Sequence, residues 1–165
     1  ALRGLREIEA EREADPLRRL ASLLSDAASA QPLAELLRLS NAEGERLAAL
    51  LSPPDTISAE LEARALRREN YTHGAERMVD WLTLAWAGNM DGAESYRRMI
   101  KAANSWSPAT LPIKGADALD LGLTAGPDIG DLLKEVERWW IDEDFAPTRA
   151  ECLEKLSDLA AARNA

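Results

Sequence analysis

The 165 residues of this chain are 46% hydrophobic and carry a formal net charge of −9. That length holds one domain or two small ones, and the apolar content is sufficient for a buried core. The acidic balance argues against a surface that is basic throughout, which is a common feature of nucleic-acid-binding proteins. No apolar run approaches the roughly 20 residues of a membrane-spanning helix, so we expect no contact with a membrane.

The single cysteine, Cys152, excludes an internal disulfide and any zinc site built on several cysteines. It fits the reducing cytoplasm, where we expect the protein to reside. The chain begins with Ala1 rather than methionine, shows no signal sequence, and has helical spacing from Leu2 through Leu5 to Ile8. We interpret this beginning as that of a piece cut from a longer protein.

Apolar residues recur every three or four positions along the chain, and no alternating strand pattern persists. This spacing predicts an all-α protein of about nine helices without a sheet. Four segments are preceded by a side chain that can cap the first N–H groups of a helix. These signals are Asp15 before Pro16, Ser40 with Glu43, Asp91 with Glu94, and Thr148 with Glu151.

The segment from Ser105 to Pro112 contains two prolines and little helical spacing. It predicts a boundary between a larger helical body, residues 1–105, and a smaller helical tail, residues 106–165. Trp106 lies at this boundary, and we expect it to anchor the linker because tryptophan usually buries most of its surface. Trp139 and Trp140 are adjacent on one predicted helix, so one should be buried and the other partly exposed.

A glycine-rich segment follows in the tail, from Ile113 to Gly130. It predicts two short helices, the first from Asp117 to Leu121, stopped by a left-handed Gly122, and the second with Pro127 in its first turn. A helix start attracts anions because its N–H groups are free and its dipole is positive. A phosphate is therefore one candidate ligand, and an ordinary capped helix hairpin is the alternative. The residues expected at this phosphate site are Lys114, Gly115, Gly126 and Gly130.

Three stretches resemble one known family. The pattern I-K-G-x-D-x-L-x-L-G-L-x-x-G-P-x-I-G-x-L-L-K-x-V, from Ile113 to Val136, is similar to the C-terminal region of bacterial tRNA nucleotidyltransferases and their poly(A) polymerase relatives. The run from Leu37 to Glu43, which contains R-L-S-N-A-E and is followed by Arg46-Leu47, resembles a segment in the helical body of the same family. The closing segment from Trp139 to Pro147 resembles its terminal helices, so the resemblance covers most of the chain in the same order.

The resemblance implies that this chain grips tRNA by its elbow and acceptor region. In that family, a separate N-terminal head adds C, C and A from CTP and ATP with Mg²⁺, using a Gly-Ser pair and an Asp-x-Asp metal site. Nothing in this sequence matches that head. We therefore expect no catalytic residue, metal ligand or cofactor in this chain, and no transferase activity from the chain alone. The expected partners are tRNA and the family's catalytic head, with a homodimer as a further possibility.

Two clusters of basic residues have helical spacing, so the members of each cluster share one helix face. Arg64, Arg67 and Arg68 form the first, and Arg97, Arg98 and Lys101 form the second. They are candidates for RNA contacts, while a solvated face balanced by nearby acids is the alternative. Charge argues against the tail as an RNA surface, because residues 106–165 contain 6 Lys or Arg against 12 Asp or Glu.

Other chemistry finds little support in the sequence. His73 is the only histidine, which argues against histidine-based metal sites and against a Ser-His-Asp arrangement. Asp142 and Asp144 fall in a predicted turn, where they are expected to cap and solubilise rather than to bind a metal. The main alternative to RNA binding is a helical module that binds a protein partner or forms a dimer, with Trp139 or Trp140 exposed at the contact.

Overall fold

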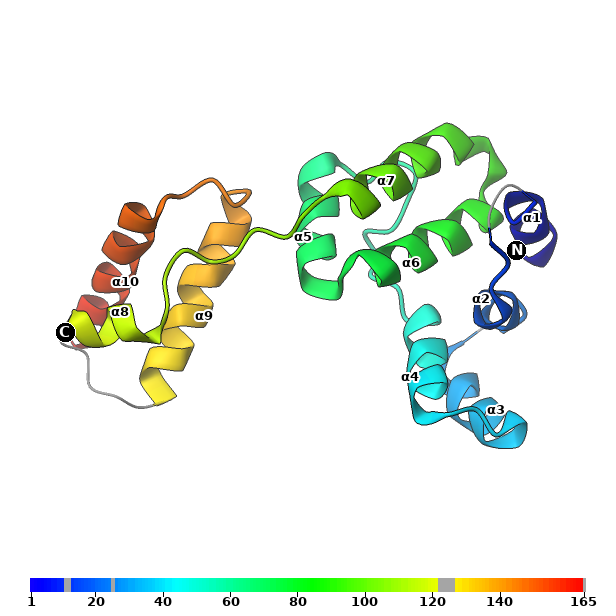
Figure 1. Ribbon diagram of the computed structural model, residues 1–165, viewed down its shortest axis with the longest axis horizontal. Helices are drawn as coiled ribbons and strands as arrows, with labels where there is room; N and C mark the ends of the chain where they lie inside the picture. The colour runs from blue at the N-terminus through cyan, green and yellow to red at the C-terminus, as the bar shows by residue number, and fades with distance from the viewer. Residues whose placement is uncertain (11–12, 25, 122–126, 165) are drawn as a thin grey trace. The chain divides into compact units, whose positions relative to one another are not determined.

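Helices form the regular structure of the chain in the computed structural model, which describes residues 1–10, 13–24, 26–121 and 127–164 (Figure 1). Within these ranges there are ten α-helices, two short 3-10 helices and no strand, so the predicted all-α class is confirmed. The contacts divide the chain into two compact units, Ala1–Trp106 and Ser107–Ala165. The residues Gly122 and Gly126 of the glycine-rich segment lie outside the described ranges.

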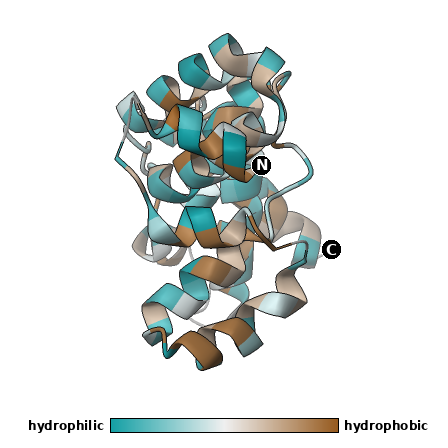
Figure 2. Cartoon of the chain, turned by 90° about the vertical axis from the view of Figure 1, so that its right-hand side faces the viewer, coloured by the Kyte–Doolittle hydropathy of each residue, from teal (hydrophilic) through white to brown (hydrophobic). Residues whose placement is uncertain are grey.

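Unit 1 contains the first seven α-helices and the two 3-10 helices. They are α1 (Leu2–Ile8), α2 (Pro16–Ala21), η1 (Ala27–Ser29), α3 (Ala30–Leu37), α4 (Asn41–Leu50), α5 (Ala63–His73), α6 (Ala75–Gly88), η2 (Met90–Gly92) and α7 (Ala93–Ser105). Unit 2 contains α8 (Gly115–Asp120), α9 (Pro127–Asp142) and α10 (Arg149–Asn164). Brown and teal segments alternate along the helices in Figure 2, as expected for amphipathic helices that bury one face.

Helix α6 is the centre of unit 1, because it packs against α1, α4, α5 and α7. Its side chains Met78 and Leu82 have no exposed surface, and Trp81 and Trp86 are also buried. Burying each such apolar side chain contributes about 1.5–3 kcal/mol relative to leaving it in water. The burial of α6 on most of its sides explains why its neighbours can be short helices with little intrinsic stability.

Helices α1 and α6 approach so closely that one position requires glycine. A Cβ atom added at Gly4 would lie 2.5 Å from the backbone oxygen of Ala87 and 3.1 Å from Sδ of Met90. The backbone oxygen cannot move aside without shifting α6. A small second cluster, with Leu47 and Leu50 at its centre, is buried among α2, α3 and α4.

The capping signals are confirmed at three of the four predicted positions. Asp15 accepts a hydrogen bond from the Arg18 N–H at 2.8 Å at the start of α2, and Ser40 exchanges hydrogen bonds with Glu43 at the start of α4. Thr148 and Glu151 do the same at α10. The signal at Asp91 is wrong: this residue lies within η2, and Gly92 is the residue that precedes α7.

Two helices end in a left-handed residue that is not glycine. Arg38 ends α3 with φ of 53°, and its N–H and that of Leu39 donate to the carbonyls of Glu35 and Ala34. Asp144 ends α9 with φ of 57°, and the ring of Phe145 contacts that of Trp140 edge to face at 5.0 Å. Both endings have the crossed hydrogen bonds of a Schellman motif, and at α9 these run from the N–H groups of Asp144 and Phe145 to the carbonyls of Ile141 and Trp140.

Unit 2 is built on the packed pair α9 and α10, with α8 against α9. Its buried side chains include Val136 and Leu156, neither of which has any exposed surface. Trp140 is buried and its Nε1–H donates to the Pro147 carbonyl at 3.2 Å, whereas Trp139 is half-buried beneath the Lys155 ammonium. The predicted difference between the two tryptophans is therefore confirmed. Pro127 begins α9, also as predicted.

Candidate functional site

Both predicted basic clusters lie on helices of unit 1 that pack against each other. Arg64, Arg67 and Arg68 are on α5, and Arg97, Arg98 and Lys101 are on α7; all are exposed except the half-buried Arg67. The helices are joined by a buried hydrogen bond from Nδ2 of Asn70 to the carbonyl of Ala103, at 3.0 Å. We call α5 and α7 with these six cations the basic helix pair.

The basic helix pair contains few acids of its own. Between Ala63 and His73 the only acidic residue is Glu69, and between Ala93 and Ser105 it is Glu94. Glu69 already accepts a hydrogen bond from Thr56 and lies 3.4 Å from Nε2 of His73. Six cations against two carboxylates give this pair a positive charge within an acidic chain, and local charge governs the approach of a polyanion.

One cation of the pair is held by an aromatic ring. The guanidinium carbon of Arg97 lies 4.9 Å from the centre of the Trp86 ring, within the range of a cation–π contact. Arg98 donates from Nη2 to the hydroxyl of Ser95 at 3.2 Å. These contacts limit the conformational freedom of the Arg97 and Arg98 side chains.

The predicted phosphate residues of the tail fall in unit 2. Lys114 is exposed just before α8, Gly115 is the first residue of α8, and Gly130 is exposed in the first turns of α9. A Cβ at either glycine would meet no atom within 4 Å, so both face open space. The contribution of Gly126 to this site lies outside the described residues.

The start of α8 already holds a carboxylate. Oδ2 of Asp117 accepts a hydrogen bond from the Lys114 N–H at 2.7 Å, and both oxygens of Asp117 are paired with Arg149. The hydrogen bonds from Arg149, followed by that from Lys114, hold the pKa of Asp117 below its usual value. A phosphate at this helix start would therefore have to approach an ionised carboxylate.

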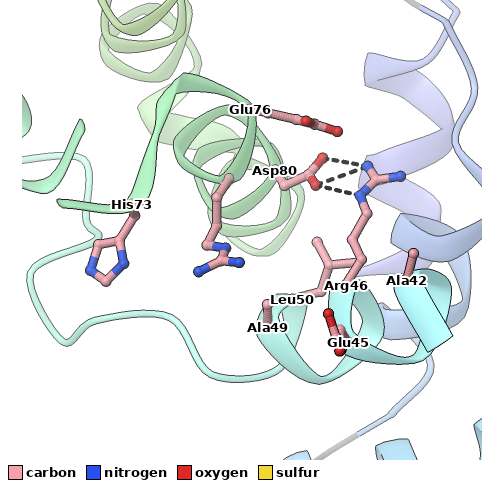
Figure 3. Close-up of a pocket in the computed structure, with 9 residues that line it drawn as sticks. Ala42, Glu45, Arg46, Ala49, Leu50, His73, Glu76 and Asp80 are labelled. Atoms are coloured by element: carbon pink, nitrogen blue, oxygen red, sulfur yellow. Dashed lines mark hydrogen bonds and ion pairs between the residues drawn. The ribbon is translucent and has the colours of Figure 1, made fainter. Parts of the chain in front are cut away.

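Sequence reasoning missed a groove between α4 and α6 in unit 1 (Figure 3). It has a volume of about 250 Å³, and we call it the α4–α6 groove. The residues that line it are Ala42, Glu45, Arg46, Ala49, Leu50, His73, Glu76, Arg77 and Asp80. They come from the consecutive helices α4, α5 and α6, and the packing of α4 against α6 brings them together. The charged residues Glu76, Arg77 and Asp80 on the otherwise apolar helix α6 are the signal in the sequence that could have indicated the groove.

An ion pair between the half-buried Arg46 and the buried Asp80 lies in the groove. Arg46 donates to both carboxylate oxygens of Asp80 at 2.8–3.0 Å, and also to Oδ2 of Asp15 at 2.8 Å. Burial raises the pKa of Asp80 above its usual value, against the lowering effect of Arg46. Burial also raises the pKa of Asp15, but the hydrogen bonds from the Arg18 N–H and from Arg46 outweigh it, so the pKa of Asp15 lies below its usual value. These three groups satisfy one another, so their role is to hold α2, α4 and α6 together.

One end of the groove is organised by the buried indole of Trp81. Its Nε1–H donates to the carbonyl of Ala49 at 2.7 Å, which ties α6 to α4. The His73 ring contacts the indole edge to face at 5.0 Å, and the guanidinium carbon of Arg77 lies 6.0 Å from its centre. A rigid aromatic group therefore positions two planar polar side chains at the groove.

Among the described residues, no group of three or more His, Cys, Asp or Glu side chains is arranged to hold a metal ion. No helix in the described ranges is both long and apolar enough to cross a membrane. Cys152 is buried, and burial raises the pKa of its thiol. In comparisons with known proteins, no family model matches this chain, and no curated protein matches it either.

Proposed function

We propose that this chain binds RNA as the C-terminal portion of a tRNA nucleotidyltransferase or poly(A) polymerase relative. In this role, it positions the tRNA elbow and acceptor region for a catalytic head that the chain does not contain. The observation that carries the proposal is the basic helix pair, in which two helices that carry basic clusters about 30 residues apart in the sequence pack against each other. The choice of tRNA as the ligand rests on the resemblance of the segments that begin near Arg38 and at Ile113 to the tRNA nucleotidyltransferase family.

The basic helix pair suits a duplex better than a base sequence. An A-form helix shows side chains its phosphates and 2′-hydroxyls, and little of its base edges. Exposed guanidinium and ammonium groups on two packed helices supply cations at helical spacing along such a backbone. The acidic remainder of the chain repels the same backbone, so contacts with the phosphates are favoured at the basic helix pair.

The test is a fluorescence-anisotropy titration of labelled tRNA at about 50 and 200 mM salt. Each phosphate contact that is lost lowers the slope of log K against log salt by about one unit. The variant Arg64→Gln/Lys101→Gln removes one exposed cation from each helix of the pair, so we expect weaker binding and a slope lower by about two. The control Lys134→Gln/Arg138→Gln removes the same charge from α9 and should leave both quantities unchanged.

Two results would overturn the proposal. One is the absence of saturable, salt-sensitive binding by a chain that is helical by circular dichroism. The other is an equal loss of affinity in the test and control variants, because that would show attraction by total charge rather than by the basic helix pair.

A second candidate function, a protein-binding module, is favoured by exposed leucines on α3 and just after α2. Leu36 is 77% exposed, Leu23 is 64% exposed and Leu37 is 50% exposed. Large exposed apolar side chains are candidates for an interaction surface. Self-association of the chain in sedimentation, abolished by Leu36→Gln and unaffected by the α5 and α7 variant, would support this function as a dimer.

A further inference from the structure

The α4–α6 groove has polar groups that the buried ion pair does not use. Glu45, Glu76 and Arg77 have no hydrogen-bond or ion-pair partner within the part of the chain that the structure describes. In Figure 3, Glu45 and Glu76 lie on opposite sides of the Arg46–Asp80 pair, and His73 lies at the far end. The groove therefore presents free acceptors and a free planar donor around a fixed centre.

The charges of the lining decide which ligands fit. Three carboxylates face two guanidinium groups, and Arg46 is already committed to Asp80 and Asp15. A phosphate would meet more negative than positive charge, and a simple cation would meet the guanidinium of Arg77. A neutral, planar ligand with both donors and acceptors on its edge avoids both conflicts.

A planar ligand also needs a planar side chain on which to stack. Unpaired bases of RNA are bound by stacking on aromatic or guanidinium planes and by hydrogen bonds to their edges. His73 provides such a plane at the Trp81 end, while Ala42, Ala49 and Leu50 supply apolar wall. The volume of about 250 Å³ equals that of roughly eight water molecules at about 30 Å³ each, which is room for one base.

We propose that the α4–α6 groove binds one unpaired guanine base of RNA, an inference that rests on the proposed RNA-binding function. Guanine presents two neighbouring donors, N1–H and the N2 amino group, that one carboxylate accepts together. It also presents two neighbouring acceptors, O6 and N7, which are the usual partners of arginine. Glu45 or Glu76 accepts from the first edge, and Arg77 donates to the second. Cytosine and uracil lack this combination, and adenine lacks the donor at N1.

The experiment titrates the whole 165-residue chain with the mononucleotides GMP, IMP, AMP and CMP. The NMR signal of the Trp81 indole N–H reports binding, because this group lies beside the groove and has a fixed partner in Ala49. We expect saturable shifts with GMP. IMP keeps O6, N7 and N1–H but lacks the 2-amino group, so it should bind about tenfold more weakly.

Variants separate recognition from folding. Glu45→Gln/Glu76→Gln should abolish the preference for GMP over IMP, and Arg77→Gln should weaken GMP about tenfold. Glu154→Gln and Arg138→Gln change the same residue types at exposed positions of unit 2 and should have no effect. Circular dichroism establishes that each variant is folded.

The inference is overturned if GMP binds no better than IMP and CMP, or if the preference survives in the double glutamine variant. Binding of tRNA without binding of GMP would overturn this inference and leave the proposed function standing. Binding of GMP without binding of tRNA would overturn the proposed function and retain a guanine site in the groove.

Discussion

The buried pair of Arg46 and Asp80 allows a sharp test of how unit 1 is held together. We consider Arg46→Met, which keeps an apolar stem of similar length and removes the charge. The Asp80 side chain is only 7% exposed, so its carboxylate gains little contact with water in exchange for the lost partner. Unit charges about 4 Å apart attract by about 4 kcal/mol at an effective dielectric constant of about 20.

The expected loss of unfolding free energy depends on the charged group that remains without its partner. Removing one partner of a buried pair typically costs about 3–5 kcal/mol. Nε of Arg18 stays 3.7 Å from Asp80 and offsets part of this, so we expect Arg46→Met to lower the free energy of unfolding by about 3 kcal/mol. Asp80→Asn leaves Arg46 about one-third exposed and still paired with Asp15, so about 1–2 kcal/mol is expected. The double variant should cost less than the sum.

Urea unfolding followed by circular dichroism measures these free energies. Lys134→Met is the control, because Lys134 and Asp131 form an exposed pair that contributes at most about 0.5 kcal/mol. The pH dependence gives a second check. Since the pKa of Asp80 is already raised by burial, losing Arg46 raises it further, and the cost of Arg46→Met should shrink as acid protonates the carboxylate. Equal costs for Arg46→Met and Lys134→Met would refute the reasoning.

Two further predictions concern a close approach and a capping carboxylate. Gly4→Ala should destabilise the chain by about 1–3 kcal/mol in thermal unfolding, because the added Cβ meets the backbone of Ala87. The control is Gly44→Ala, whose added Cβ has its nearest contact at 3.5 Å. This control should be neutral or stabilising by up to about 1 kcal/mol. Arg149 lowers the pKa of Asp117, so that pair stabilises the fold above the unfolded pKa near 3.8 and the stabilisation is lost as pH falls through the lower folded value. Arg149→Met should therefore lose less stability than the unmodified chain between pH 7 and pH 3 in urea titrations, and equal losses would contradict this.

Local chemistry explains which features the sequence predicts well. A capping box needs only Ser40 and Glu43 at the right spacing, and a proline start needs only Asp15 and Pro16, so both follow from neighbouring residues. Asp91 has the same spacing to Glu94 but fails as a cap. The chain forms η2 there, and Gly92 packs against Ala59 and Tyr96, where an added Cβ would lie 2.9 Å from the tyrosine ring.

The groove and its ion pair depend on contacts that local spacing does not contain. Arg46 and Asp80 are 34 residues apart, and Trp81 finds the Ala49 carbonyl across 32 residues. Arg38 in the left-handed region is another case, because the crossed hydrogen bonds at the end of α3 hold a residue where glycine would be expected. Each of these features becomes visible only when the helices are packed.

The structure gives the residues of the R-L-S-N-A-E segment, and Arg46 and Leu47 after it, a role in stabilising the fold. Ser40 and Glu43 cap α4, Arg46 holds Asp80, and Leu47 is wholly buried. Each of these contacts stabilises the helical body, so the segment has a structural role that does not depend on a ligand. A loss of RNA binding after changing Ser40 or Arg46 would therefore be ambiguous, because it would follow from unfolding alone. Exposed cations such as Arg64 and Lys101 on the basic helix pair do not contribute to the buried core. Their variants can therefore lower RNA affinity without lowering the stability of the fold.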